Sequence, residues 1–183
     1  NWYMSGRSPI EFRTKMKEAG RTQVRFDGSP ENDWLCPSSP ENQKLEIDSM
    51  VEVATKYDVD GIHFDYIRYP DKDACFCGRC RELFEKQIGR KVEHWPADVR
   101  KNPALRETWH EFRRGNITPI VAAVAEAVHK NRPKVKVSAA VWPFWNTERD
   151  NISQDWKLWC EKGYMDFVCP MDYRERNAQF RNM

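Results

Sequence analysis

The sequence lacks three features that define large classes of protein. Its longest apolar stretch, at residues 135–145, is far shorter than the roughly 18 to 20 residues needed to span a bilayer, and it contains no signal peptide. The 30 basic and 28 acidic side chains leave a formal charge of +2, which gives no electrostatic reason to bind nucleic acid or an anionic membrane. It also has no glycine-rich GxGxxG turn. We therefore expect no membrane-spanning segment in this region, no nucleic-acid partner and no organic cofactor.

Aromatic residues, in contrast, are plentiful in a chain that is otherwise polar. Phe, Trp and Tyr make up 13% of it, and 8 residues are tryptophan, although the mean hydropathy is -0.84. Flat amphipathic rings in polar surroundings suit the stacking of sugars in a cleft, whereas burial in the core is the alternative for most of the tryptophans. The composition is thus consistent with a carbohydrate ligand, and the motifs described below bear on this interpretation.

Strand and helix patterns alternate along the chain. Apolar residues at helical spacing, with capping signals, predict helices at residues 9–19, 40–57, 79–87, 105–130 and 153–161. Apolar and β-branched runs predict strands that end near Met4, Tyr66, Trp142 and Asp172, and residues 5–36 are expected to be mostly a long functional loop. Because no hairpin signals separate these units, the strands should be parallel and covered by helices, which is an α/β fold.

Two of the predicted strands share an arrangement of acids. The strands that begin at residues 60 and 166 each open on an aspartate and close on Asp-Tyr, at Asp65-Tyr66 and Asp172-Tyr173. Carboxylates at the carboxyl ends of parallel strands are typical of β/α-barrel enzymes, and the missing GxGxxG turn argues against a doubly wound sheet. A whole barrel needs about 250 residues, so we expect residues 1–183 to form a single segment of a (β/α)8 TIM barrel, incomplete at both ends.

The stretch at residues 58–70, Asp-Val-Asp-Gly-Ile-His-Phe-Asp-Tyr-Ile-Arg-Tyr-Pro, concentrates polar side chains at the end of a strand. Alternation places Ile62 and Phe64 against covering helices and turns Asp65 toward the other face. A buried carboxylate in that position is costly unless it is paired or used in chemistry. Asp65 is therefore the first catalytic candidate, and the alternative is a structural acid that bonds loop amides or Arg68.

Four motifs resemble those of one known family. Trp-Leu-Cys-Pro-Ser at residues 34–38, the stretch at 58–70, Val-Trp-Pro-Phe at 141–144 and the strand at 166–173 are similar to segments of the glycoside-hydrolase-like family 10 proteins, a (β/α)8-barrel group also filed as a domain of unknown function. The resemblance implies that the chain covers barrel strands three to six. It further implies a glycoside hydrolase acting on a polysaccharide or cell-wall glycan, and a secreted or periplasmic location.

Glycoside hydrolysis usually requires two carboxyl groups across the scissile bond, one ionised and one protonated. Alternate strands of a barrel contribute to the same inward layer, so Asp65 and Asp172 are expected to converge on one substrate. We assign Asp65 as nucleophile or base and Asp172 as the first candidate for the acid, with Glu148 and Glu175 as alternatives on neighbouring loops. His63, one pleat before Asp65, is expected either to donate to that carboxylate or to be a satisfied core histidine.

Substrate contacts are expected from polar and aromatic side chains at or near the ends of strands. The candidates that share this position are His63, Tyr66, Arg68, Tyr69, Trp142, Trp145 and Tyr173, of which Trp142 and Trp145 are expected to stack on sugar rings. A second hypothesis is a barrel that binds glycans without cutting them, because the strand at residues 134–142 ends without the Glu that many barrel glycosidases place nearby. The two hypotheses differ in whether a second reacting carboxyl group is present.

The cysteines form a second sharp pattern. Cys75, Cys77 and Cys80 have the spacing C-x-C-x2-C, which suits thiolate coordination of zinc, and Cys36 is the candidate fourth ligand because it precedes a helix on the same face of the sheet. Family 42 β-galactosidases bind zinc through a cluster that this one resembles in spacing. A closed four-thiolate site would brace the loop rather than catalyse, and the alternative is a disulfide between two of the four in an oxidising compartment. The other two thiols are expected in the core: Cys160 and Cys169.

Overall fold

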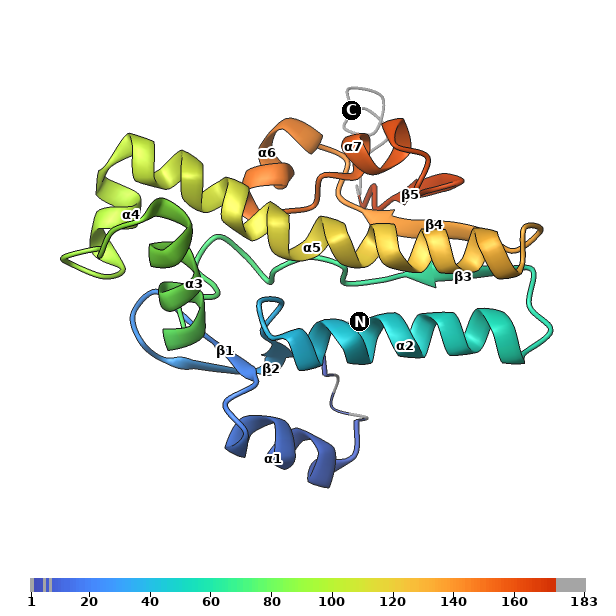
Figure 1. Cartoon of the computed structure of the whole chain (residues 1–183), viewed down its shortest axis with the longest axis horizontal. Coiled ribbons are helices and arrows are strands. Elements are labelled where there is room, and N and C mark those ends of the chain that lie inside the picture. Colours follow the sequence, from blue (N-terminus) through green and yellow to red (C-terminus); the bar gives the residue numbers. More distant parts are fainter. Residues whose placement is uncertain (1, 5, 7, 174–183) are drawn as a thin grey trace.

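The computed structural model of the chain describes residues 2–4, 6 and 8–173, which form an α/β arrangement. The elements follow one another as α1 (Ile10–Glu18), β1 (Thr22–Val24), β2 (Pro30–Leu35), α2 (Pro40–Lys56), β3 (Gly61–Phe64), α3 (Gly78–Ile88), α4 (Ala97–Lys101), α5 (Pro103–Asn131), β4 (Lys136–Val141), α6 (Trp145–Asn151), α7 (Trp156–Glu161) and β5 (Phe167–Pro170). Figure 1 shows the long helices α2 and α5 running side by side along β3 and β4. In the described part of the chain no helix is both long and apolar enough to cross a membrane.

Strands β3, β4 and β5 form one parallel sheet, in that order. Gly61 lies opposite Lys136, and Ser138 lies opposite Phe167. Helices α3, α4 and α5 lie between β3 and β4, while α6 and α7 lie between β4 and β5. The alternation of strands and helices expected from the sequence is therefore confirmed for this part of the fold.

One face of the parallel sheet is apolar and contributes to the core. Ile62 and Phe64 of β3 are buried, and Val137 and Ala139 of β4 are completely buried. They belong to the same core cluster as the buried stripe of α5, which includes Ile117, Ile120, Val121, Val124 and Val128. The burial of alternate residues on β3 fixes which of its side chains are left for the opposite face.

Helix ends follow their sequence signals. Ser39 caps α2, where its side-chain oxygen accepts a backbone N–H of the first turn at 3.4 Å. Asn102 caps α5 in the same way, with an N–H to oxygen distance of 3.0 Å. Gly89 ends α3 with a φ of 69°, a left-handed conformation that glycine adopts readily. The predicted helices that correspond to α1, α2, α3 and α5 are confirmed within a few residues.

The N-terminal region corrects two predictions. Residues 5–36, expected to be mostly loop, contain β1 and β2, which pair antiparallel. The segment ending at Met4, expected to be a fourth parallel strand, instead forms an antiparallel bridge in which Tyr3 lies opposite Trp34 of β2. The hairpin was missed because both strands are short and largely polar, and because the connection at residues 25–29 is longer than the two-residue turns that mark hairpins in a sequence.

The C-terminal half of the structure differs from the predictions in three details. Helices α4 and α6 were not predicted, and the helix expected at 153–161 begins three residues later, as α7. Gln154 explains the delay, since its side chain accepts the N–H of Trp142 at 2.8 Å and donates to the carbonyl of Ala140 at 3.0 Å, which ties the preceding segment to β4. Cys160 and Cys169, expected in the core, are exposed, because Cys169 lies on the edge strand β5 and Cys160 on the outer side of α7.

Candidate active site and cysteine cluster

The carboxyl end of β3 presents two polar side chains on the face of the sheet opposite its buried residues. His63 and Asp65 are both exposed. The prediction of a buried Asp65 is therefore wrong for the described residues, because their core packs on the opposite face of the sheet, which carries Ile62 and Phe64. The Nδ1 atom of His63 lies 2.9 Å from the Oγ atom of Ser138, its neighbour on β4. The Oδ1 atom of Asp65 accepts the backbone N–H of Tyr66 at 2.9 Å. Of the two alternatives expected for His63, the bond to Asp65 is not found among the described residues; the ring is satisfied by Ser138, but it is exposed and not in the core.

Tyr66 lies in an unusual backbone conformation directly after this carboxylate. Its φ is 57°, in the left-handed region that bulky residues rarely adopt. The Tyr66 ring lies 5.0 Å from that of Tyr3 and 5.7 Å from that of Trp34, between centroids. The guanidinium of Arg68 lies 5.1 Å from the Tyr66 ring and 5.3 Å from the Trp34 ring, and burial lowers its pKa. A strained turn held by packing beside an exposed acid is typical of functional sites.

A cleft of about 410 Å³ opens beside this strand end. Its lining comes from the loop after β3 and from the segment between β4 and α7, and includes Arg68, Asp71, Lys72, Trp142, Glu148 and Asn151. Arg68 and Trp142 were expected to bind substrate, and Glu148 was an alternative for the acid. Sequence reasoning missed Asp71 and Lys72. Both directly follow the strand motif, and that position in the sequence could have marked them as candidates.

Asp172 follows β5 at the carboxyl-terminal end of the sheet, the same end at which Asp65 follows β3. The pairing of β4 with β5 continues to the residue before Asp172, through a backbone hydrogen bond of 2.8 Å. Its Oδ1 atom is buried and has no hydrogen-bond partner among the described residues. Tyr173 is exposed, and its ring lies edge-on to that of Trp142 with 6.3 Å between centroids. The alternative acid Glu175 lies outside the described residues.

Two side chains expected to contact sugars are engaged elsewhere. Tyr69 is completely buried, with the guanidinium of Arg113 4.3 Å from its ring centroid, and burial raises the pKa of Tyr69 well above its usual value. Trp145 donates its indole N–H to Asp155 at 2.7 Å, and the ammonium of Lys157 lies 4.9 Å from its ring centroid. The expected role does not fit these positions, because a ligand cannot reach Tyr69 and cations already occupy the ring of Trp145.

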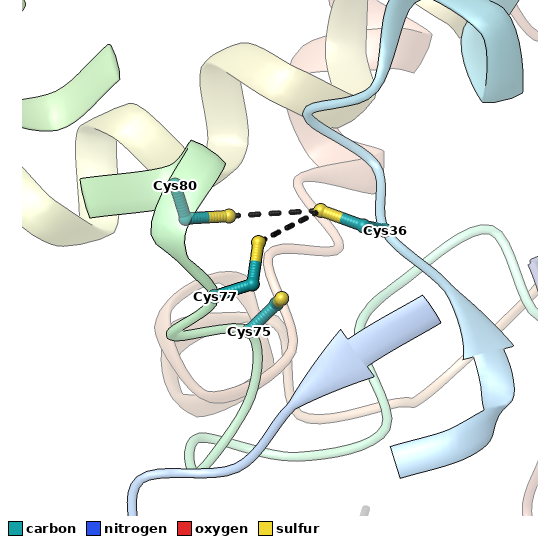
Figure 2. Close-up of side chains that lie close together, drawn as sticks. All are labelled: Cys36, Cys75, Cys77 and Cys80. Carbon is teal, nitrogen blue, oxygen red and sulfur yellow. Dashed lines mark hydrogen bonds between the residues drawn. The ribbon is translucent and has the colours of Figure 1, made fainter. Parts of the chain in front are cut away.

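Figure 2 shows four cysteines converging from two parts of the chain, Cys36 after β2 and the other three around the beginning of α3. The sulfur of Cys36 lies 3.8 Å from that of Cys77 and 3.6 Å from that of Cys80, and the sulfurs of the four, including Cys75, all lie within 4.8 Å of one another. These separations are far longer than the roughly 2.05 Å of a disulfide bond. Four sulfurs bound to one zinc ion at about 2.3 Å would lie about 3.8 Å apart at the corners of a tetrahedron. The spacing therefore fits a tetrahedral metal ion.

The surroundings of the cluster affect which thiols lose their protons. The hydroxyl oxygen of Ser38 lies 3.1 Å from the sulfur of Cys36 and 3.2 Å from that of Cys80. Burial raises the pKa of Cys75, whereas hydrogen bonds from the three other cysteines lower the pKa of Cys77. Four soft sulfur donors in a buried site are the ligand set that zinc prefers.

Comparison with known protein families agrees with the fold. The family described as Glycosyl hydrolase-like 10 matches residues 3–183. The chain belongs to this family. The family expected from the sequence motifs is thereby confirmed, and this glycosyl hydrolase-like 10 chain carries Asp65 and Asp172 at the edge of the sheet where barrel enzymes place their chemistry.

Curated relatives of this glycosyl hydrolase-like 10 chain are longer proteins. It is 30% identical over 122 residues to an S-layer-related protein from Niallia circulans, which covers 59% of this chain and 8% of that protein. It is 24% identical over 155 residues to glycosyl hydrolase YngK from Bacillus subtilis strain 168, which covers 76% of this chain and 28% of that protein. The chain therefore spans less than a third of the length of these relatives.

Solved glycoside hydrolases have the same fold. The PgaB (BpsB) glycoside hydrolase domain from Bordetella bronchiseptica matches with a TM-score of 0.69 and 14% identity, over 89% of this chain and 49% of that one. A β-galactosidase from Bacillus circulans sp. alkalophilus matches with a TM-score of 0.64 and 14% identity, over 94% of this chain and 30% of that one. The glycosyl hydrolase-like 10 chain is therefore a partial α/β domain with a TIM-barrel-like glycoside hydrolase fold.

Proposed function

We propose that the chain is a single segment of a glycoside hydrolase domain that cleaves a polysaccharide or cell-wall glycan, with Asp65 and Asp172 as the reacting carboxyl groups. The observation that carries this proposal is their position. Strands β3 and β5 flank β4 in one parallel sheet, so the two acids follow the carboxyl ends of strands that are two apart, at the same end of the sheet. Glycoside hydrolases usually place two carboxyl groups across the scissile bond. Family membership and the shared fold support the same class of reaction.

The two acids take different roles in this proposal. Asp65 attacks the anomeric carbon or activates a water, and Asp172 protonates the leaving oxygen. The backbone N–H of Tyr66 orients the Asp65 carboxylate. Glu148 lines the cleft and is the alternative acid. The two candidates for the acid that lie among the described residues are thus Asp172, after β5, and Glu148, on α6.

The substrate would lie across the cleft beside the strand ends. Trp142 and Tyr173, whose rings lie edge-on to each other, offer apolar faces on which a sugar can stack. Arg68 lines the same cleft and can donate to sugar hydroxyl groups. His63, exposed on the face that carries Asp65, is a further contact on the inner side of the sheet.

Substitution of Asp65 in the intact protein tests the assignment. Asp65→Asn keeps the shape of the side chain and removes the ionisable group, so glycan hydrolysis should fall by at least ~100-fold while thermal unfolding stays unchanged. Asp60→Asn, at the amino end of the same strand, is the matched control and should retain hydrolysis. Near-normal hydrolysis by a folded Asp65→Asn protein would contradict the assignment.

A barrel that binds glycans without cutting them is the second candidate. The sequence of β4 favours it: the strand ends at Val141 and is followed by Trp142, and neither residue carries a carboxyl group. In that case the parent protein would bind a glycan and release no sugar, and Asp65→Asn would bind the glycan as tightly as the parent does. Release of a reducing sugar by the parent protein excludes this alternative.

We also propose that Cys36, Cys75, Cys77 and Cys80 hold one structural zinc ion. The support is their separation, which is close to that of tetrahedral ligands, together with the four-sulfur donor set. A closed site of this kind leaves no position for a water, so the ion would brace the loop that leads from β3 to α3. It would also protect the thiols in a protein that acts outside the cytoplasm, a location that the S-layer-related relative supports.

A further inference from the structure

A second pocket lies beside the cleft, between the loop after β3, helix α4 and the first half of α5. Its volume is about 220 Å³, and four of its lining residues are cations: Lys72, Arg100, Arg106 and Arg113. A water in the bulk liquid occupies about 30 Å³, so the pocket has room for a ligand of several non-hydrogen atoms. Lys72 lines both this pocket and the cleft, so the two adjoin.

Three of these cations have no carboxylate partner. The side chains of Lys72 and Arg106 are exposed at the rim and form no ion pair with any residue that the structure describes. Arg113 is 1% exposed, and its terminal nitrogens donate to backbone carbonyl oxygens at 2.7 and 3.1 Å, which are neutral acceptors. Arg100, in contrast, pairs with Asp73. The pocket therefore carries an excess of positive charge.

Two buried nitrogens of pocket-lining residues lack a hydrogen-bond partner within the described ranges, Nε1 of Trp109 and Nε of Arg113, and both can only donate. Trp109 and Arg113 are one turn apart on the same face of α5. The ring of Trp109 stacks on that of Phe76, with 5.1 Å between centroids and 18° between planes, and forms an apolar wall. Buried donors without partners are rare in native proteins, so their concentration at one pocket indicates an acceptor that comes from outside the chain.

We propose that this pocket binds a tetrahedral oxyanion, a phosphate or sulfate group. Such a group supplies several acceptor oxygens and negative charge, which match the unpartnered donors and the excess of cations. A metal ion does not fit, although ligand atoms of Glu107, His110 and Asp150 lie within 4.8 Å of one another, because Arg114 pairs with both carboxylates. The site does not depend on the reaction proposed for the neighbouring cleft.

Calorimetric titration of the intact protein with inorganic phosphate tests this site, at an ionic strength held constant with chloride. The exposed cations are removed singly by Lys72→Gln and Arg106→Gln, neither of which leaves a buried cavity. Each variant should bind phosphate about tenfold more weakly, because one charge-assisted contact is lost. Lys130→Gln removes the same charge from an exposed position near the other end of α5 and should leave the affinity unchanged.

Glucose 6-phosphate is the second probe and distinguishes the source of the anion. Equal affinity for both probes indicates a free ion, whereas tighter binding of the sugar phosphate that Lys72→Gln weakens indicates an ester whose sugar extends toward the cleft. With either probe the indole N–H signal of Trp109, assigned with Trp109→Phe, should shift in nitrogen-edited proton NMR spectra. No saturable binding of either probe, or equal effects of Arg106→Gln and Lys130→Gln, would overturn the proposal.

Discussion

Glu85 is a carboxylate that the fold nearly buries and surrounds with donors. It is 5% exposed, and its oxygens lie 2.8 Å from Nζ of Lys91 and 2.9 Å from Nε of Arg81. The backbone N–H of Val92 donates to it at 3.0 Å. The bonds from Lys91, Arg81 and Val92 hold the pKa of Glu85 at about 2. The side chain thereby fastens α3 to the segment that follows it.

Glu85→Gln should lower stability at neutral pH and reduce the pH dependence of stability. The pKa of Glu85 is about 2 in the folded protein against an ordinary value of 4.5, so its stabilisation is complete above the ordinary value and is lost as the pH falls from 4.5 toward 2. Urea unfolding at neutral and acidic pH measures the difference. Glu82→Gln, on the exposed side of the same helix, is the control, and an equal loss on acidification in Glu85→Gln and the parent would contradict the prediction.

Along β3, the sequence predicted the face on which each side chain lies up to Asp65, but not for the residues after it. Along β3 the alternation of buried and exposed side chains holds, which put Asp65 on the correct face. The positive φ of Tyr66 then turns the chain, so that Ile67 and Tyr69 both become completely buried. A non-glycine residue in this conformation leaves no mark in the hydrophobic pattern, and the position of Tyr69 was therefore not predictable from spacing.

At the scale of elements, α5 contributes to several parts of the molecule. Its apolar stripe belongs to the core, and its first half lines the oxyanion pocket. The helix begins at the cap Asn102, whose side-chain oxygen accepts the N–H groups of Ala104 and Leu105 at 3.0 and 3.3 Å. The cap is exposed, so its contribution to stability is separable from packing.

We expect Asn102→Ala to destabilise the protein by about 1 kcal/mol, because two N–H groups in the first turn lose their acceptor. Asn102→Asp restores an acceptor at the same position and should bring stability back to nearly that of the parent. Chemical denaturation of the three proteins measures the difference. If the Ala and Asp variants unfold at the same denaturant concentration, the capping bond does not stabilise α5.

Element length determined which parts of the fold could be predicted. Helices α2 and α5 have 17 and 29 residues, long enough for both an apolar period and an N-cap to appear. Helices α4 and α6 have 5 and 7 residues, which is too short for a period to be visible. Strands β1 and β2 were missed for a related reason, since a short polar hairpin is stabilised by contacts with distant segments. The bond from the N–H of Phe76 to the carbonyl of Val24, at 2.8 Å, is one of these contacts.

At the scale of the whole molecule, the cysteine cluster joins segments that are far apart in the chain. Cys36 follows β2, whereas the other three cysteines lie around the start of α3. The loop between β3 and α3 also lines the cleft and the oxyanion pocket. The grouping of the four thiols was predictable because the C-x-C-x2-C spacing marks three of them, and the position of Cys36 before a helix on the same face of the sheet marks the fourth. The cleft was predictable only in part, because α6, which carries Glu148, leaves no periodic signal.

Loss of the proposed zinc ion should therefore affect stability as well as metal content. Cys77→Ser removes one of four ligands, so zinc per protein should fall toward zero and the melting temperature should drop by at least about 5 °C. Cys169→Ser, an exposed cysteine outside the cluster, is the matched control and should change neither value. Elemental analysis and thermal unfolding give the two readings. A parent protein without zinc but with a disulfide between Cys36 and Cys75 would favour the oxidised alternative.

Strands β3 and β5 are the edges of the parallel sheet in the described residues, each hydrogen-bonded to β4 on one side. Phe167, on β5, is 50% exposed. Open edges with apolar side chains pair readily with strands of other molecules, which leads to aggregation. We therefore expect a polypeptide in which both β3 and β5 stay bare to self-associate as its concentration rises.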